Sequence, residues 1–223
     1  MTRVAAAIPA FEAAASIETI VRRTGRIIPE VLVIDDGSSD ETSDEACRAG
    51  AEVLVFEANR GKGAALDRAF ALLFGRGVEA VVTLDADGQH LPEEIPKLLA
   101  RMHDADLVIG GREHHFAEMG AVRRASNRLS SYAISRVAGL RLADVQSGFR
   151  LYHRRVIEAT GFPEARFDAE SAVVVRAACR GLRVLSVPAR LGFADGRTTS
   201  HYRPIVDSLR IARAVIKARL EEL

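Results

Sequence analysis

Cysteine and surplus charge are both scarce in this sequence of 223 residues. Its two cysteines, Cys47 and Cys179, lie far apart and have no metal-ligand spacing around them. We therefore expect reduced thiols rather than a disulfide framework or a zinc site. The 31 basic and 30 acidic residues leave a formal net charge of +1. Such a small net charge argues against a nucleic-acid protein held by bulk electrostatics.

Long apolar runs and linker-like stretches are missing as well. No window approaches the roughly 20 apolar residues of a membrane span, and residues 1–8 are too short for the core of a signal peptide. We therefore expect a cytoplasmic protein, which would meet a membrane only peripherally, at its inner face. Because there is no internal repeat and no Pro/Ser/Gly-rich linker, residues 1–223 are expected to form a single domain. The sequence gives no indication of an oligomeric state.

Stretches of strand length alternate with stretches of helix length through the first half of the chain. The expected strands are apolar on both faces, as is typical of parallel strands covered by helices on each side. This pattern predicts an α/β fold with a Rossmann-like, doubly wound and mostly parallel sheet. The expected strands are 3–9, 30–35, 51–56, 78–84 and 106–111, and the expected helices are 12–23, 40–49, 61–75 and 92–102.

Beyond residue 112 the pattern becomes less regular. We expect a long helix over 120–140, strands over 147–153 and 183–191, and helices over 169–180 and 205–223. The last helix is amphipathic and carries basic residues beside its apolar stripe. We expect it to pack on its own domain rather than to rest on anionic lipid. The stripe consists of Ile205, Leu209, Ala212, Ile216 and Leu220, and the basic residues are Arg210, Arg213 and Lys217.

Two acidic loops follow the second and fourth expected strands. Asp35 and Asp36 lie in the first loop, and Asp85 and Asp87 lie in the second. Open parallel sheets bind ligands beyond the carboxyl ends of their strands, so these side chains are candidates for one shared site. Carboxylate oxygens together with Gln89 suit magnesium or manganese better than zinc. The alternative for either loop alone is a turn with capping acids.

Seven motifs in order along the chain resemble those of a known enzyme family. They read "IPAFEAAAS", "VLVIDDGSSDET", "NRGKGAALDRAF", "LDADGQH", "LVIGGR", "QSGFRLY" and "SHYRP". Together they resemble the family 2 glycosyltransferases of the GT-A fold, and most of all the dolichol-phosphate mannosyltransferase or polyprenyl-phosphate glycosyltransferase branch. The resemblance implies that residues 1–112 form the nucleotide-sugar and metal half, and residues 113–223 the acceptor-side half with its C-terminal amphipathic helix.

The implied activity is inverting hexosyl transfer from a nucleoside diphosphate sugar, of the GDP-mannose or UDP-glucose type, to a polyprenyl or dolichyl phosphate. The implied cofactor is Mg²⁺ or Mn²⁺. The residues implied for the nucleotide sugar are Pro9, Phe11, Ile34, Asp36, Asp85, Ala86, Asp87, Arg112 and Arg197. Those implied for the metal are Asp85, Asp87 and Gln89. Those implied for the acceptor are Arg123, Arg124, Arg128, Gln146 and Ser147, and the catalytic candidates are Asp87, Glu170 and Asp168.

The residues leave several alternatives open. A hydroxyl acceptor needs a carboxylate to take its proton, and Glu170, Asp168 or Asp144 would serve, whereas a lipid phosphate is already ionised and needs none. The basic segment 123–128 is either an anion site or a solvated helix face. Glu12 and Ala13 stand where the family usually has Asn and Glu, which leaves guanine and uracil undistinguished.

Two other functions compete with sugar transfer. The stretch "VTLDADGQ" imitates the nucleophile motif of haloacid-dehalogenase-type phosphatases. A non-enzymatic module that binds a nucleotide sugar would keep Asp36 but would have no need of the metal residues.

Overall fold

The computed structural model describes residues 2–111, 131–132, 134–140, 142, 144–190, 192 and 204–222, with side chains in the last segment from residue 210 onward. The implied residues Arg112, Arg123, Arg124, Arg128 and Arg197 lie outside the described residues, as does most of the helix expected over 120–140.

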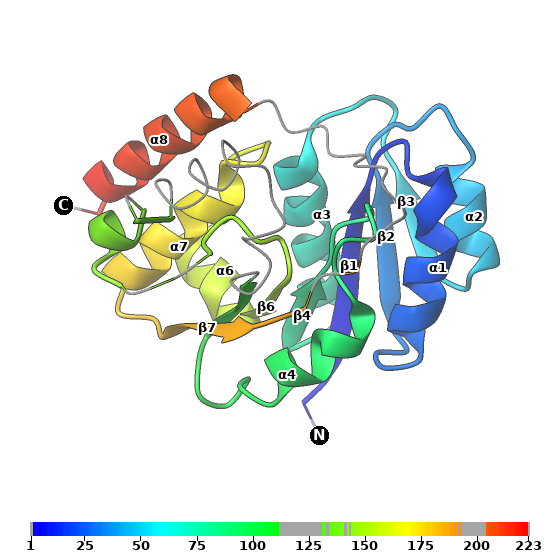
Figure 1. Cartoon of the computed structure of the whole chain (residues 1–223), viewed down its shortest axis with the longest axis horizontal. Helices are drawn as coiled ribbons and strands as arrows, with labels where there is room; N and C mark the ends of the chain where they lie inside the picture. The colour runs from blue at the N-terminus through cyan, green and yellow to red at the C-terminus, as the bar shows by residue number, and fades with distance from the viewer. Residues whose placement is uncertain are drawn as a thin grey trace.

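A seven-stranded mixed sheet forms the centre of the molecule, in the order β3-β2-β1-β4-β6-β5-β7 (Figure 1). All neighbouring strands are parallel except that β6 runs antiparallel to both β4 and β5. The expected α/β fold with a mostly parallel sheet is therefore confirmed. The strands are β1 (Val4–Ala10), β2 (Val31–Asp35), β3 (Glu52–Val55), β4 (Ala80–Thr83), β5 (Leu107–Gly111), β6 (Arg150–His153) and β7 (Val184–Pro188).

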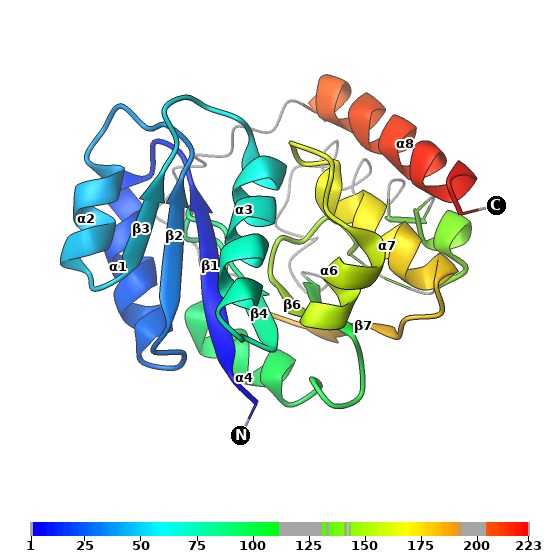
Figure 2. The same cartoon turned by 180° about the vertical axis from the view of Figure 1, so that it is seen from behind.

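Helices cover both faces of this sheet and enclose two apolar cores (Figures 1 and 2). One core lies between the sheet and α1 and α4, and the other lies between the sheet and α3, α6, α7 and α8. The buried apolar surface on each side fixes the strand ends, and hence the loops that follow them. The helices are α1 (Ala14–Gly25), α2 (Thr42–Arg48), α3 (Lys62–Gly75), α4 (Ile95–Leu99), α6 (Arg154–Thr160), α7 (Ala169–Cys179) and α8 (Pro204–Leu220), with a 3₁₀ turn at Pro92–Glu94.

Some element boundaries differ from the expectation for identifiable reasons. Helix α1 begins at Ala14 rather than at residue 12, because Glu12 adopts a left-handed backbone conformation with φ 52°. The helix expected over 92–102 is a 3₁₀ turn followed by the short α4, in which Pro96 has no N–H to donate to the preceding turn. Helix α6 and the antiparallel direction of β6 were not expected, since apolar periodicity does not report strand direction.

Helix α8 packs on α7, as expected, but through a different stripe of residues. Its buried residues are Ile211, Ala214, Val215 and Ala218, which follow helical spacing. Two residues of the expected stripe, Ile216 and Leu220, are instead 56% and 63% exposed. The side chains of Ile205 and Leu209 are not among those that the structure describes. The helix thus has two apolar faces, and our choice between them was wrong. In the part of the chain that the structure describes, no helix combines the length and the hydropathy needed to span a bilayer.

Candidate functional site

The acidic loop after β4 is held in shape by its own hydrogen bonds. The Asp85 backbone N–H donates to His90 Nδ1 at 3.1 Å, and the Gln89 N–H donates to Asp87 Oδ1 at 3.0 Å. From α1, the Ser16 hydroxyl donates to the Ala86 carbonyl at 2.5 Å. These contacts turn the chain sharply after the strand, which brings Asp85 and Asp87 out of the sheet on neighbouring positions.

His90 supports this loop from beneath. Its ring is buried and stacks on Phe149 with 5.5 Å between ring centroids. Because Nδ1 accepts a hydrogen bond from the Asp85 amide, that nitrogen carries no proton. Its 3.7 Å approach to Asp85 Oδ2 is therefore not an ion pair. His90 was not singled out from the sequence, although it closes the quoted motif "LDADGQH".

The cation that meets Asp85 in the folded chain is Lys62, the first residue of α3. Its Nζ lies 2.5 Å from Asp85 Oδ1 and 2.9 Å from Glu170 Oε2. The Lys62 side chain is 12% exposed and that of Glu170 is 5% exposed. Burial alone would lower the pKa of Lys62, but Asp85 and Glu170 outweigh it and raise that pKa above the usual lysine range. The ammonium is thus charged and bridges the β4 loop to α7.

Gly148, from the motif "QSGFRLY", makes room for this bridge. A Cβ at this position would lie 2.4 Å from Lys62 Nζ and 2.7 Å from both Asp85 carboxylate oxygens. The neighbouring chain is fixed by the Thr83 hydroxyl, which donates to the Gly148 carbonyl at 2.8 Å. Any side chain at residue 148 would therefore fill the space in which the lysine meets its two carboxylates.

Four segments that are far apart in sequence thus meet at one point. They are the β4 loop with Asp85, the start of α3 with Lys62, the turn before β6 with Gly148, and the start of α7 with Glu170. The family resemblance predicted that Asp85 and Glu170 belong to the site, but it did not predict Lys62 or Gly148. The signal was present in "NRGKGAA", where a lysine lies between two glycines.

Those two glycines bring the α3 start against the segment before α7. A Cβ at Gly63 would lie 2.2 Å from the Glu164 carbonyl oxygen, and one at Gly61 would lie 2.5 Å from that of Ala165. The Ala64 N–H donates to the same Ala165 carbonyl at 3.0 Å. Close packing at a helix start is therefore what requires these glycines.

Both acids of the first loop serve to hold backbone. Asp36 is buried and accepts the N–H groups of Arg60 and Gly61, each at 2.7 Å. Burial raises the pKa of Asp36, and these two amides partly offset the rise. Asp35 accepts the Ser38 N–H at 2.9 Å and the Ser43 hydroxyl. The carboxylates therefore fix the loop after β2 against the start of α3.

The two departures from the first motif are also accounted for by contacts with this loop. Glu12 Oε1 accepts the Ser39 N–H at 2.7 Å, and the Glu12 N–H donates to the Ser38 hydroxyl at 2.9 Å. The Ala13 N–H donates to the Thr42 hydroxyl at 2.8 Å. Glu12 thus ties the β1 and β2 loops together, which is a structural use of its carboxylate.

The other residues implied for the nucleotide differ in how much of their surface is exposed. Pro9 is buried in β1 and Ile34 in β2, where the Ile34 side chain belongs to the apolar core. Phe11 is half-buried at the end of β1. Only the backbone of Ile34 is therefore available to a ligand, whereas the ring of Phe11 has exposed surface.

Of the residues implied for the acceptor, Ser147 is fully buried and its hydroxyl accepts the Phe149 N–H at 3.3 Å. Asp144 is also fully buried and accepts the Gln146 N–H at 3.2 Å. The buried Arg150 braces this turn by donating to the carbonyls of Ser147 and Val145. Gln146 differs, because its buried Nε2 has no hydrogen-bond partner among the described residues.

The acidic loop has the character of a divalent-cation site. Three carboxylates, those of Asp85, Asp87 and Glu170, gather around the single ammonium of Lys62. Such an excess of carboxylates suits a divalent ion. Burial and the nearby Asp85 raise the pKa of Asp87. A bound cation would favour the charged form of this carboxyl and so lower its pKa again. Among the described residues no group of three His, Cys, Asp or Glu side chains could hold a metal. Further ligands would therefore come from a diphosphate and water, as is usual for Mg²⁺.

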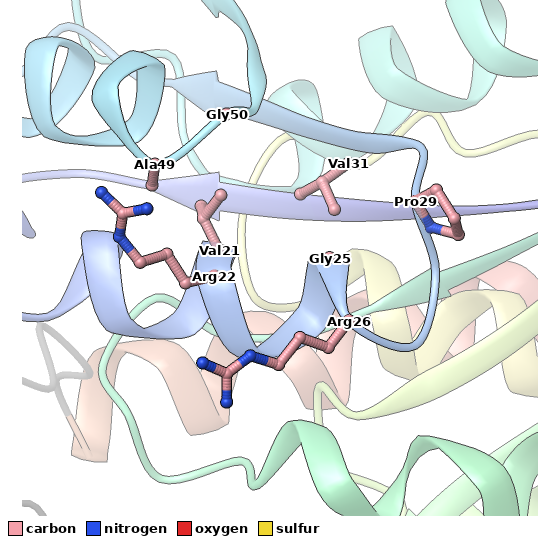
Figure 3. Close-up of a pocket in the computed structure, with 8 residues that line it drawn as sticks. All are labelled: Val21, Arg22, Gly25, Arg26, Pro29, Val31, Ala49 and Gly50. Carbon is pink, nitrogen blue, oxygen red and sulfur yellow. The ribbon is translucent and has the colours of Figure 1, made fainter.

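A separate cavity of about 380 Å³ lies at the opposite end of the sheet (Figure 3). It is bounded by the C-terminal ends of α1 and α2 and by Val31, the first residue of β2. Arg22 extends toward Ala49 in this view, whereas Arg26 extends away from Val31. None of the candidate site residues lines this cavity.

Comparison with known sequences agrees with the motif resemblance. The family described as Glycosyl transferase family 2 matches residues 6–161. An undecaprenyl-phosphate mannosyltransferase of Micrococcus luteus is 33% identical over 200 residues, which cover 83% of this chain and 82% of the relative. An undecaprenyl-phosphate 4-deoxy-4-formamido-L-arabinose transferase of Enterobacter sp. is 32% identical over 169 residues, 70% of this chain. The match spans only 50% of that longer relative.

Solved structures share the fold. Glucosyl-3-phosphoglycerate synthase from Mycobacterium tuberculosis, in complex with phosphoglyceric acid, superposes with a TM-score of 0.76 at 22% identity. The superposition covers 99% of this chain and 80% of the synthase. A complex of the same synthase with Mn²⁺, uridine diphosphate and glucosyl-3-phosphoglycerate gives a TM-score of 0.72. At this identity the likeness shows the fold, and it carries no residue roles.

Proposed function

Because this chain belongs to glycosyl transferase family 2 and is a glycosyltransferase, we propose that it moves a sugar from a nucleoside diphosphate sugar to a polyprenyl phosphate, with inversion and with Mg²⁺ or Mn²⁺. The family membership also removes the phosphatase and the non-enzymatic binding module as alternatives. The names of the two undecaprenyl-phosphate transferases support the acceptor class.

The observation that carries the proposal is the ion pair between Lys62 and Glu170. A general base must offer a carboxylate oxygen to the acceptor's proton, and a buried ammonium 2.9 Å away already occupies Glu170 Oε2. Asp144 is buried inside the fold as well. An acceptor that is already ionised, such as a phosphate monoester, needs no base and therefore suits this site.

The reaction consists of one displacement. A phosphate oxygen of the acceptor attacks the anomeric carbon from the face opposite the leaving group, the bond to the diphosphate breaks, and its electron pair leaves with the nucleoside diphosphate. When bound, a divalent cation neutralises charge that develops on the leaving diphosphate. No proton has to be removed in this step.

The residues proposed for each task follow from the geometry and the motifs. Asp85, Asp87 and Gln89 would hold the cation, with His90 and Ser16 fixing their loop. Phe11, the backbone of Pro9 and Ile34, and the loop held by Asp36 would bind the nucleoside, with Ala86 beside the diphosphate. Gln146, whose buried Nε2 has no hydrogen-bond partner among the described residues, would face the acceptor. Arg112, Arg123, Arg124, Arg128 and Arg197 remain sequence-based candidates for phosphate contacts.

The second apolar face of α8 supports work at a membrane surface. Ile216 and Leu220 are exposed one helical turn apart, and Arg213 and Lys217 are exposed beside them. An apolar stripe with adjoining basic residues suits an anionic lipid surface, where a polyprenyl phosphate would be found. We propose peripheral binding through this face.

A transfer assay tests the proposal. Purified protein would be given radiolabelled GDP-mannose or UDP-glucose, undecaprenyl phosphate in detergent, and either Mg²⁺, Mn²⁺ or a chelator. We expect labelled lipid and free nucleoside diphosphate only with a metal ion. Label found on a carbohydrate hydroxyl but never on the lipid phosphate would overturn the proposed acceptor, and unchanged transfer with the chelator would overturn the metal requirement.

A further inference from the structure

Two hydrogen-bonding positions remain unused in the Lys62 cluster. An ammonium has three N–H donors, and the described residues accept two of them, at Asp85 Oδ1 and Glu170 Oε2. Glu170 Oε1 is buried and has no hydrogen-bond partner in the described part of the chain. One donor on Lys62 and one acceptor on Glu170 therefore lie side by side on groups that already touch.

Such a pair is costly to leave unpaired. A buried carboxylate oxygen gives up its hydration on folding, and native structures rarely leave such an atom without a partner. Glu170 Oε2 is already satisfied by Lys62, so the chain could have kept the ion pair with less cost by exposing Oε1. The arrangement is explained if a ligand supplies the missing group.

The shape of the site limits which ligand group that is. The partner must accept from Lys62 and donate to Glu170 at once, which a hydroxyl does and a phosphate at neutral pH does not. The position adjoins Asp85, whose side chain keeps 30% exposure and opens the cluster outward. Gly148 itself places no side chain between this cluster and a ligand, since even a Cβ there would stand 2.4 Å from Lys62 Nζ.

We propose that Lys62 and Glu170 together bind one hydroxyl of the sugar that is transferred, and so determine which sugar the enzyme accepts. This inference rests on the proposed function, because it takes the metal at Asp85 and Asp87 to hold the donor diphosphate and the sugar to follow it. It assigns Glu170 to substrate recognition in place of proton transfer.

The variant Glu170→Gln tests the contact. If the amide oxygen of the glutamine accepts the hydrogen bond from Lys62, its NH₂ group takes the place of Oε1. The sugar hydroxyl then meets a donor where it needs an acceptor. We expect roughly 10- to 100-fold weaker binding of the nucleotide sugar and a similar loss in kcat/KM. Binding of the nucleoside diphosphate with Mg²⁺ should stay within about twofold, because that ligand has no sugar. Glu158→Gln, the same change on the exposed surface of α6, should alter neither.

A panel of donors gives a second measurement that needs no variant. Nucleotide sugars that lack one hydroxyl at a time would be titrated against the wild type. We expect one analogue to lose roughly 10- to 100-fold in affinity and the others to lose little. With Glu170→Gln, that same analogue should bind no more weakly than the parent donor, because the contact is already lost.

The outcomes separate the two proposals. The proposed sugar contact is wrong if removal of no single hydroxyl weakens binding of the nucleotide sugar to the wild type. It is also wrong if the affinity losses from Glu170→Gln and from the analogue multiply when the two are combined. If Glu170→Gln weakens the nucleoside diphosphate as much as the nucleotide sugar, the residue acts on the loop and the contact is again wrong. If one hydroxyl matters but lipid phosphate receives no sugar, the proposed acceptor fails and the sugar contact stands.

Discussion

Lys62 Nζ lies 2.5 Å from Asp85 Oδ1, so the first carboxylate of the acidic motif is paired with a cation before any ligand binds. Asp87 forms no ion pair with a lysine among the described residues, and burial together with the charge of Asp85 raises its pKa. The two acids of one motif thus differ in environment. Asp85 is positioned by the protein, and Asp87 is the one whose charge remains to be matched.

Asp87→Asn should therefore remove most of the metal-dependent activity. The change keeps the volume but deletes a charge, and we expect sugar transfer to fall roughly a thousandfold, equivalent to about 4 kcal/mol. The melting temperature without ligand should change little, while the added stabilisation by nucleoside diphosphate with Mg²⁺ should disappear. Glu93→Gln, at the exposed residue of the 3₁₀ turn, is the matched control. Full metal-dependent stabilisation of Asp87→Asn would contradict the assignment.

Gly148→Ala should separate Lys62 from Asp85. The new methyl group would stand 2.4 Å from Nζ, and the lysine has to move because the β6 turn is fixed by Thr83. We expect at least a tenfold loss of transfer, measured as kcat/KM. Gly75→Ala at the end of α3 meets nothing within 4 Å and should leave transfer unchanged. Equal activity of both variants would show that the Lys62–Asp85 contact is not needed.

Asp168→Asn distinguishes the acceptor classes. Asp168 Oδ1 is buried without a hydrogen-bond partner among the described residues, which makes it the remaining base candidate. With a phosphate acceptor no base is required, so kcat should stay within about threefold of the wild type. A fall of roughly 100-fold or more, with normal binding of the nucleotide sugar, would instead favour a hydroxyl acceptor and a base at this residue.

Arg176→Met should destabilise the fold rather than the chemistry. Arg176 is buried on α7 and pairs with Glu164 and with Glu221 beyond α8. Its loss leaves Glu164 buried without its cation, at a cost of about 3–5 kcal/mol in the free energy of unfolding. Arg22→Met breaks an exposed pair with Glu18 and should cost less than about 1 kcal/mol. Urea denaturation of both variants measures the difference, and equal costs would refute it.

The ion pairs of Glu94 should make the free energy of unfolding depend on pH. Burial would raise its pKa, but Lys97 and Arg190 outweigh burial and hold the pKa below the usual glutamate range. A carboxyl pKa that is lower in the folded state contributes stability above the unfolded value of about 4.3. That contribution is lost as the pH falls through the folded pKa. Glu94→Gln should therefore flatten the loss of stability below about pH 5, as followed by urea denaturation, and an unchanged slope would contradict this.

The sequence predicted the parts of the site that lie on strand ends. Asp85 and Asp87 follow a run of buried residues, and strand periodicity with the carboxyl-end rule was sufficient to place them at the sheet edge. Lys62 and Gly148 could not be placed in this way. Their meeting depends on the reversed direction of β6, which no local pattern reports.

Helix α8 shows the same limit on a smaller scale. Its sequence carries two apolar stripes, and helical periodicity describes both equally well. Which stripe is buried depends on how α8 packs against the surface of α7. Ile211 and Val215 are buried in this interface, whereas Ile216 and Leu220 are exposed. Pattern analysis predicted the helix and its docking, and packing decided the face.

The place of β6 in the sheet has a consequence for hybrid enzymes. This strand lies beyond residue 112 in the sequence, yet in the sheet it lies between β4 and β5, and β7 flanks β5 on its other side. A chimera joined at residue 112 would give β5 two foreign neighbours and would place a foreign Gly148 over Lys62. Hybrids between relatives should therefore fold well only when β6, β7 and the residues they face are exchanged together.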